Sequence, residues 1–463
     1  MTYDIIVIGS GPGGYVAAIR ASQLGFKVAV VEKSELGGIC LNWGCIPTKA
    51  LLKSASVFKY LKHAADYGIM IEGSFRADFE TIVKRSRGVA EQMSRGIQFL
   101  FKKNNIDVIA GKAKLLPEKQ VEVCDNENNV QIYKANHIII ATGGRSKELP
   151  HLKQDGKKII SYREAMTLNQ QPQTMVVVGS GAIGTEFAYF YQTLGTQVTL
   201  VEFLPNILPI EDEEVSKQLE RSFKKSGMKV MTSSSVDSVE VEDGLCKVSI
   251  STPKGVQLVS CDVVLSAVGV VSNIENMGLE ETGIKTAYGK IEVDDFYRTN
   301  TEGYYAIGDV VKGPMLAHVA SAEGIICVEN IAGLNPHALD YSNIPGCTYC
   351  TPEVASVGYT EKKAIEAGYD IKVGKFPFTA SGKASASGAK DGFIKVIFDA
   401  KTNQWLGAHF IGENVTEMIA EVVVARTLKA SGHDIIKSVH PHPTMSEAIM
   451  EAVAAAYGEV IHM

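Results

Sequence analysis

Cysteine is scarce in this chain, with 8 residues in 463. This is too few for the disulfide-stapled framework of a small secreted domain, so a pair that does oxidise is expected to be catalytic. No apolar run reaches the roughly 20 residues that are needed to span a bilayer. Basic residues are not in excess, and a net charge of -6 argues against both a nucleic-acid-binding surface and a polybasic membrane anchor.

A targeting segment ahead of the fold is not expected either. An apolar strand is predicted from Tyr3 onward, which leaves no room for a signal or transit peptide. We therefore expect a bacterial cytoplasmic protein, or the mature form of an organelle-matrix protein. The length indicates about three domains of roughly 150 residues each, and 45% apolar with 21% charged residues is typical of a soluble globular protein.

One pattern occurs twice in the chain. In each copy an apolar strand leads into Gly-x-Gly-x-x-Gly, Leu-Gly follows 15 residues after the first glycine, and an acidic residue follows 23 residues after it. A second apolar strand lies between them, at 28–31 in one copy and 198–201 in the other. The marked residues are Gly9, Gly11, Gly14 and Glu32 in the first copy, and Gly179, Gly181, Gly184 and Glu202 in the second.

This pattern is typical of the βαβ unit that binds a dinucleotide. The first glycine permits a tight turn, the second lets the backbone approach a pyrophosphate, and the third lets helix and strand pack closely. The phosphates face the positive end of the helix, and the acid accepts hydrogen bonds from a ribose. A single run of this kind can be an ordinary glycine-rich turn, but two copies with matching spacings predict two dinucleotide sites.

Two further strands end in glycine, one at Thr142, Gly143 and Gly144 and the other at Gly308 and Asp309. The carboxylate after the second strand can accept from a ribityl or ribose hydroxyl. We predict an α/β fold with two Rossmann-like domains and a C-terminal α+β domain that contains a strand at 392–398 and a helix at 416–429. The expected bounds are 1–145 for the first domain, 146–275 for the second, 276–340 for a segment that returns to the first, and 341–463 for the last.

Two cysteines follow the first acid, in the motif Gly-Gly-Ile-Cys40-Leu-Asn-Trp-Gly-Cys45-Ile-Pro-Thr-Lys49, which is expected to open a helix. In a regular helix, residues five apart point about 140° away from each other, so a disulfide would need a distorted turn, which Gly44 and Pro47 permit. Helix N-terminal N–H groups would also lower a thiol pKa here. Two buried small residues are the alternative, but the position directly after a dinucleotide fold favours a redox pair.

The motif resembles that of the flavin-dependent pyridine nucleotide–disulfide oxidoreductases, and the resemblance covers essentially the whole chain. The C-terminal motif His440-Pro-His442-Pro-Thr-Met-Ser-Glu447 is similar to that of the dihydrolipoamide dehydrogenase branch. This implies oxidation of protein-bound dihydrolipoamide by NAD+ in 2-oxoacid dehydrogenase complexes, with the glycine cleavage system as a further candidate. It also implies lipoyl domains as partners, and a homodimer in which the C-terminal domain of one chain covers the flavin of the other.

The resemblance also assigns the site residues. The catalytic set would be Cys40, Cys45, His442 and Glu447. FAD would be held by Gly9, Gly11, Gly14, Glu32, Lys49, Ala113, Thr142, Gly143, Gly144, Asp309, Met315, Leu316, Ala317 and His318. NAD would be held by Gly179, Gly181, Gly184, Glu202, Val236 and Gly269, and Glu186 would pair with Lys49. No metal is expected.

Each catalytic residue has an implied role. Cys40 would exchange with the substrate sulfur and Cys45 would lie against the flavin, which can accept electrons from a thiolate and pass hydride to NAD+. His442 would take the substrate thiol proton, because only a thiolate attacks a disulfide efficiently, and Glu447 would orient His442. The chain departs from the family pattern at Ala113, where glycine is common, and after Gly269, where an arginine is usual.

Other readings stay open at this point. A glutathione reductase favours NADP and would have basic residues where this chain has Glu202. Mercuric reductases and large thioredoxin reductases carry a further cysteine pair or selenocysteine at the C-terminus, and the last six residues here contain neither. A non-catalytic redox flavoprotein would not need the full catalytic set. Cys347 and Cys350 could be half of a zinc site, but no second pair lies nearby, which favours a thiol-bearing strand.

Overall fold

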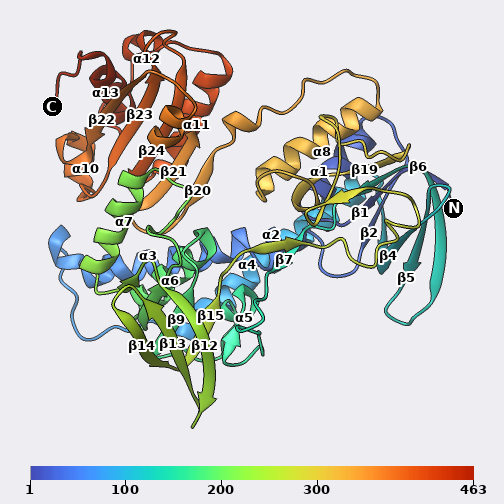
Figure 1. Ribbon diagram of the computed structural model, residues 1–463, viewed down its shortest axis with the longest axis horizontal. Helices are drawn as coiled ribbons and strands as arrows, with labels where there is room; N and C mark the ends of the chain where they lie inside the picture. Colours follow the sequence, from blue (N-terminus) through green and yellow to red (C-terminus); the bar gives the residue numbers. More distant parts are fainter. Residues whose placement is uncertain (1) are drawn as a thin grey trace. The chain divides into compact units, whose positions relative to one another are not determined.

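The computed structural model describes residues 2–463, which form two compact units (Figure 1). Each unit is made of three stretches of the chain. Among the described residues, the first comprises 2–51, Glu80–Lys147 and Gly269–Leu339, and the second comprises Leu52–Phe79, Glu148–Val268 and Asp340–Met463. The predicted α/β class is confirmed, while the four predicted domain bounds stay a prediction.

The first unit is built on a seven-stranded sheet in the order β3-β2-β1-β6-β5-β4, with β19 also paired to β6. Strands β1, β2, β3 and β19 run parallel to their neighbours, whereas β4, β5 and β6 form an antiparallel meander. The bounds are β1 Thr2–Ile8, β2 Val28–Glu32, β3 Asp107–Ala110, β4 Lys112–Leu116, β5 Gln120–Cys124, β6 Val130–Ile140 and β19 Tyr304–Ala306.

Two helices cover the parallel part of this sheet and pack on each other: α1 (Pro12–Gln23) and α8 (Ala317–Ile331). Their contact is close because small residues meet there, and a Cβ at Gly324 would lie 2.8 Å from the carbonyl oxygen of Gly13. One face of β1 and β2 packs on these helices, and the other packs on the β4–β6 meander and on residues between 277 and 311. Burial on both faces explains the apolar runs 5–8 in β1 and 28–31 in β2.

The second unit contains a parallel sheet in the order β11-β10-β9-β15-β8 and an antiparallel sheet in the order β12-β13-β14, and residues of both sheets share one hydrophobic cluster. Helix α6 (Ala182–Leu194) connects β9 to β10 and completes the second predicted βαβ unit. The strand bounds are β8 Ile159–Ile160, β9 Thr174–Val178, β10 Gln197–Val201, β11 Lys229–Met231, β12 Ser235–Glu242, β13 Leu245–Thr252, β14 Gly255–Cys261 and β15 Val263–Ser266.

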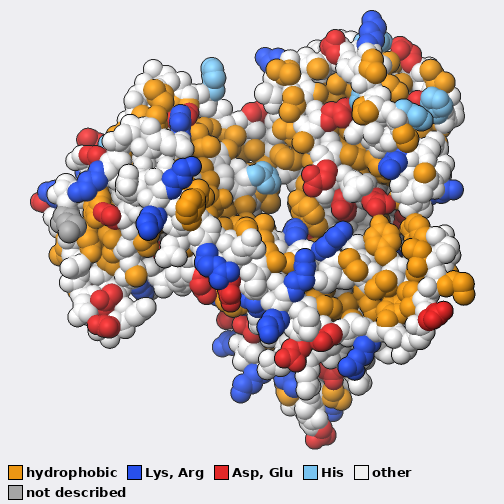
Figure 2. All heavy atoms as spheres, turned by 180° about the vertical axis from the view of Figure 1, so that it is seen from behind, with side chains coloured by type: hydrophobic (Ala, Val, Ile, Leu, Met, Phe, Trp, Pro, Cys, Tyr) orange, Lys and Arg blue, Asp and Glu red, His pale blue; other side chains and the backbone are white. Residues whose placement is uncertain are grey.

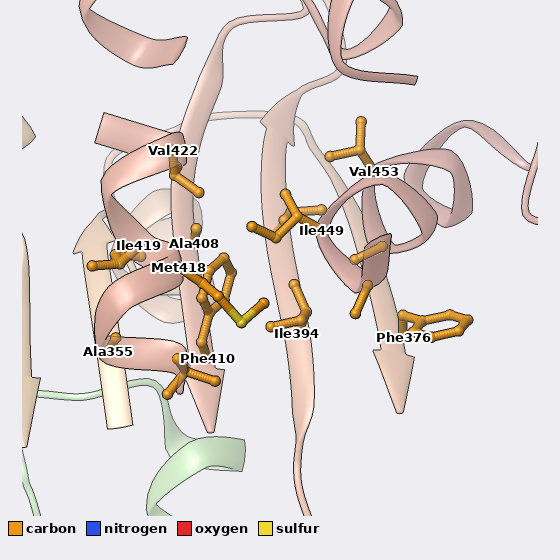
Figure 3. Packing of buried hydrophobic residues seen from close by; sticks show 14 of the residues in the cluster. Ala355, Phe376, Ile394, Ala408, Phe410, Met418, Ile419, Val422, Ile449 and Val453 are labelled. Atoms are coloured by element: carbon orange, nitrogen blue, oxygen red, sulfur yellow. The ribbon is translucent and has the colours of Figure 1, made fainter. Parts of the chain in front are cut away.

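The C-terminal part of this unit is a five-stranded antiparallel sheet in the order β20-β21-β24-β23-β22, covered by α11 (Val415–Thr427) and α13 (Glu447–Tyr457). Figure 3 shows the core between them, where Ile394 and Phe410 from the sheet meet Met418 and Ile449 from the helices. The predicted strand and helix are both present. The strand bounds are β20 Gly346–Thr348, β21 Glu353–Gly358, β22 Ile371–Pro377, β23 Phe393–Asp399 and β24 Trp405–Gly412.

The surface carries charges of both signs. On the face seen in Figure 2, Lys and Arg side chains are interspersed with Asp and Glu side chains. Across residues 2–463, no helix combines the length and the apolar character that crossing a membrane requires.

Candidate active site

The first dinucleotide turn lies between β1 and α1 and depends on its glycines for two different reasons. Gly9 has φ +103°, and a Cβ there would lie 2.3 Å from the carbonyl oxygen of Ala141. A Cβ at Gly14 would lie 1.9 Å from the carbonyl oxygen of Gly9. By contrast, a Cβ at Gly11 would meet nothing within 4 Å. Gly11 is the N-cap of α1, so open space faces the free N–H groups of that helix.

The second turn, between β9 and α6, has the same geometry. Gly179 has φ +96°, and its Cβ would lie 2.5 Å from the carbonyl oxygen of Ala267. The Cβ of Gly184 would lie 1.9 Å from the carbonyl oxygen of Gly179, whereas Gly181, the N-cap of α6, again faces open space. Both turns therefore combine two tightly packed glycines with one open backbone position at a helix N-terminus.

Each predicted ribose-binding acid accepts hydrogen bonds from the glycine-rich turn of its own repeat. One oxygen of Glu32 accepts from the backbone N–H and the hydroxyl of Ser10, at 2.9 and 2.7 Å. The corresponding oxygen of Glu202 accepts from the N–H and hydroxyl of Ser180, at 2.9 and 2.6 Å. Neither serine was predicted as a site residue, although a serine follows the first glycine in each copy of the repeat.

The glycine-rich end of β6 lies beside Asp309. The carbonyl oxygen of Thr142 accepts from the Asn273 side chain at 3.0 Å, and the Thr142 hydroxyl donates to the Asn273 carbonyl oxygen at 2.6 Å. A Cβ at Gly144 would lie 3.1 Å from a carboxylate oxygen of Asp309. Burial raises the pKa of Asp309, and the charge of Lys290 opposes this shift. Asn273 is a third residue of the site, after Ser10 and Ser180, to which the sequence assigned no role.

The other residues predicted to contact FAD in the first unit lie on two elements. Ala113 is buried in β4, where it pairs with Val123. Met315 and Leu316 directly precede α8, and Ala317 and His318 begin it. Their contact with a flavin stays a prediction.

The two cysteines lie on either side of a helix break. Cys40 belongs to α2 (Gly38–Asn42), and Cys45 begins α3 (Cys45–Lys62). Gly44 fits into this break, because a Cβ there would lie 3.1 Å from the carbonyl oxygen of Ile39. The predicted distorted turn is therefore present. The hydrogen bond between the two thiols, together with burial, raises the pKa of Cys40, and the charge of Lys49 opposes this shift.

The cysteine segment is attached directly to the first dinucleotide turn. The N–H of Gly37 donates to the carbonyl oxygen of Ser10 at 3.1 Å. A Cβ at Gly38 would lie 2.7 Å from the Cα of Gly11, so the two backbones touch. The structure thus brings the cysteine pair and the first turn together within one unit, as the sequence predicted.

The C-terminal histidine and glutamate form the predicted dyad. The Nδ1 atom of His442 lies 2.9 Å from one carboxylate oxygen of Glu447, and the N–H of Thr444 donates to the other at 2.7 Å. Burial raises the pKa of Glu447, but the hydrogen bonds from Thr444 and His442 outweigh it and lower the pKa. The imidazole ring is 78% exposed in the single chain, so its Nε2 side is open to a reactant or a partner.

The remaining predicted residues lie in both units. Glu186 is buried in α6 and accepts from the N–H of Tyr349 at 3.0 Å. Val236 is buried in β12 of the same unit. Lys49 and Gly269 belong to the first unit, so the predicted Lys49–Glu186 pair and the place of Gly269 in a nucleotide pocket stay predictions.

Two family models match this chain. Residues 3–324 match the family model described as pyridine nucleotide-disulphide oxidoreductase, and residues 344–453 match the dimerisation domain of that family. The chain is 50% identical to a dihydrolipoyl dehydrogenase of Rhizobium etli, with 100% of this chain and 99% of that protein covered, and 44% identical to one of Bacillus subtilis, with 99% of each covered.

Solved structures give the same result. LpdA from Mycobacterium tuberculosis superimposes with a TM-score of 0.90 at 26% identity, with 97% of this chain and 98% of that chain covered. The flavoprotein disulfide reductase RclA from Escherichia coli reaches a TM-score of 0.88 at 25% identity, with 98% and 99% covered. This chain therefore belongs to the pyridine nucleotide-disulphide oxidoreductase family.

Proposed function

We propose that this chain is a dihydrolipoyl dehydrogenase, which oxidises protein-bound dihydrolipoamide to lipoamide with NAD+ as acceptor. The observation that carries the proposal is the 44–50% identity, over essentially full length, to the two relatives of that name. The cysteine pair, the two dinucleotide turns and the His442–Glu447 dyad supply the groups that such a reaction requires.

The two turns fit FAD and NAD. Gly11 and Gly181 leave open space at the N-termini of α1 and α6, where free N–H groups would meet a pyrophosphate. We assign FAD to the first turn because the cysteine segment touches it through Gly38. Bound FAD supplies a carrier that accepts an electron pair from a thiolate and passes hydride to NAD+. Glu202 favours NAD over NADP, since its carboxylate would repel an added ribose phosphate.

The protein residues would then act in the following order. A thiolate of dihydrolipoamide attacks the sulfur of Cys40 in the oxidised pair, which forms a mixed disulfide and releases Cys45 as a thiolate. The second substrate thiolate displaces Cys40 and closes the lipoamide disulfide. His442 accepts the proton of each substrate thiol in turn at Nε2, because Glu447 holds its Nδ1 side at 2.9 Å. The first proton passes to solvent before the second is taken. The substrate dithiol is oxidised and the enzyme disulfide is reduced by two electrons.

Residues 344–453 match a dimerisation domain, which supports a homodimer. We further propose lipoyl domains of 2-oxoacid dehydrogenase complexes as partners, and the bacterial cytoplasm as the compartment. Relatives from Rhizobium etli and Bacillus subtilis support this compartment; the matrix is the alternative for a mature organelle protein.

A substrate panel tests the proposal. The FAD-loaded protein is assayed with dihydrolipoamide and NAD+, with dihydrolipoamide and NADP+, and with glutathione disulfide and NADPH. We expect turnover with the first pair and much smaller kcat/KM values with the other two. Preferred reduction of glutathione disulfide would replace this proposal with a glutathione reductase-like activity.

The homodimer would build each site from two chains, since the family resemblance puts His442 of one subunit over the flavin of the other. A Cys45→Ser chain and a His442→Gln chain are each inactive, but a mixed dimer has one site with both functional parts. Random reassembly makes about half of the dimers mixed, so about a quarter of the sites should regain activity. Mixed dimers confirmed by mass but without activity would contradict the shared site.

A further inference from the structure

Three consecutive residues of helix α4 (Phe79–Lys103) hold the cysteine segment from one side. All three side chains donate to backbone carbonyl oxygens of residues 42–50, which contain the turn between the cysteines and the start of α3. The contacts are Arg85 Nη1 to Ala50 at 2.7 Å, Ser86 Oγ to Pro47 at 2.9 Å, and Arg87 Nη1 to Asn42 at 2.5 Å. These three hydrogen bonds attach α4 to the cysteine segment.

Arg87 makes a second contact with the same turn. Its guanidinium carbon lies 4.1 Å from the centre of the Trp43 ring, a cation–π distance. Asn42 and Trp43 are two of the four residues between Cys40 and Cys45. Asn42 is also the last residue of α2, and carbonyls at a helix C-terminus have no partner within their own helix. Arg87 therefore satisfies a carbonyl at the point where the chain turns from one cysteine to the other.

We propose that Arg87 is a positioning residue for the cysteine pair: it anchors the turn through Asn42 and Trp43 and so keeps the sulfur atoms of Cys40 and Cys45 close together. The proposal rests on the redox role of the pair given under the proposed function. A disulfide requires the two sulfur atoms at about 2.05 Å, so a turn that cannot open favours the disulfide over the separated thiols. The half-reaction is disulfide plus two electrons and two protons to two thiols.

Loss of the anchor should shift this equilibrium in one direction. Arg87→Met keeps an unbranched apolar side chain against Trp43 but removes the charge and the donors. We expect the turn to open, and the equilibrium of the FAD-loaded enzyme to move about tenfold toward the dithiol. A tenfold change for a two-electron couple corresponds to a midpoint potential about 30 mV more positive. The thiolate-to-flavin absorbance of the reduced enzyme should weaken, while the FAD content stays unchanged.

Redox titration measures this shift directly. Wild type and variant are equilibrated with graded mixtures of oxidised and reduced dithiothreitol, alkylated, and the thiols of Cys40 and Cys45 are counted by peptide mass. Arg87→Lys should restore most of the wild-type potential, since it returns a charge and a donor. Arg95→Met is the matched control, because Arg95 lies on the same helix with an exposed side chain, and it should have no effect.

An unchanged potential in Arg87→Met would overturn the proposal, and so would an equal shift in Arg95→Met. If Arg87→Met does not fold, Arg87→Gln provides the test, because it keeps a side-chain donor but removes the charge over Trp43 and should shift the potential in the same direction by a smaller amount. No shift in that variant would overturn the anchor. Thiol counting does not depend on substrate turnover. A wild type that does not oxidise dihydrolipoamide would therefore refute the proposed function, whereas the redox titration would still test the anchor.

Discussion

Replacing Glu202 by Gln changes one carboxylate oxygen into an NH2 group, which is a donor. Both oxygens of Glu202 accept hydrogen bonds in the structure, so one of them would be lost. One oxygen of Glu202 accepts from the N–H and hydroxyl of Ser180, and the other accepts from the N–H of Leu204 at 2.8 Å. Glutamine can serve only one of these two sides. A buried donor left without an acceptor distorts the turn, and the amide also loses the charge-assisted hydrogen bonds that the carboxylate is predicted to accept from the ribose hydroxyls. Hydrogen bonds to a charged group contribute about 1.5–3 kcal/mol, so a loss of about 2 kcal/mol in binding free energy corresponds to a roughly 30-fold weaker nucleotide site.

Glu32→Gln is the matched control, because Glu32 makes the same contacts with Ser10 and with the N–H of Ser34 in the other repeat. Isothermal titration with NAD+ and measurement of FAD retention after gel filtration are done on both variants. We expect Glu202→Gln to lose NAD+ affinity and to keep FAD. Glu32→Gln should release FAD and, once reloaded, bind NAD+ as the wild type does.

Two results would refute this reasoning. Unchanged NAD+ affinity in Glu202→Gln would mean that the turn of its repeat does not bind the nucleotide. The opposite pattern, with FAD lost from Glu202→Gln and retained by Glu32→Gln, would exchange the two cofactor assignments.

Three further predictions concern the cysteines and two buried charges. Cys45→Ser should abolish the long-wavelength thiolate-to-flavin absorbance of the reduced holoenzyme, and Cys40→Ser should show it without reduction; spectra with the reverse pattern would exchange the two roles. Lys395→Met should lower the free energy of unfolding by about 3–5 kcal/mol in urea titration, because it leaves the buried Asp212, 3.0 Å from the ammonium, without its counter-charge. Lys375 is partly exposed, so Lys375→Met should lower the free energy of unfolding by about 1 kcal/mol at most. Equal losses in the two variants would contradict this prediction. Burial raises the pKa of Glu211 from 4.5 to about 7, so the contribution of its protonated carboxyl to folding stability is complete below about pH 4.5 and is lost as the pH rises to 7. Glu211→Gln should remove this pH-dependent loss of about 3 kcal/mol. A Tm of the variant that falls with pH as steeply as that of the wild type would contradict this prediction.

The sequence predicted those parts of the fold that depend on local patterns. Both βαβ units were predicted from apolar strands and from glycines that nearby residues require. At Gly14, for example, a Cβ would clash with the carbonyl oxygen of Gly9, five residues earlier. The helix break between the cysteines followed in the same way from Gly44. The order of strands in the C-terminal sheet did not, because pairing between β21 and β24 joins residues about 50 positions apart and has no local signature.

The site shows the same limit. Arg87 contacts Trp43 across 44 positions, and nothing in the helix that carries it distinguishes Arg87 from the exposed Arg95. Lys395 can be buried in β23 because three carboxylates from distant parts of the chain meet its ammonium: Asp212, Glu214 and Glu361. Residues whose role depends on a distant partner therefore need the structure, whereas Cys40 and Cys45 could be assigned from their motif.

The most direct test of the account is the initial rate of NADH formation from dihydrolipoamide and NAD+, compared between the wild type and Cys40→Ser, both loaded with FAD. The account predicts steady turnover by the wild type. It predicts no turnover above background by the variant, because the substrate thiolate then has no disulfide to attack. A wild type that forms no NADH, or a Cys40→Ser enzyme that forms it at the wild-type rate, would contradict the central claim.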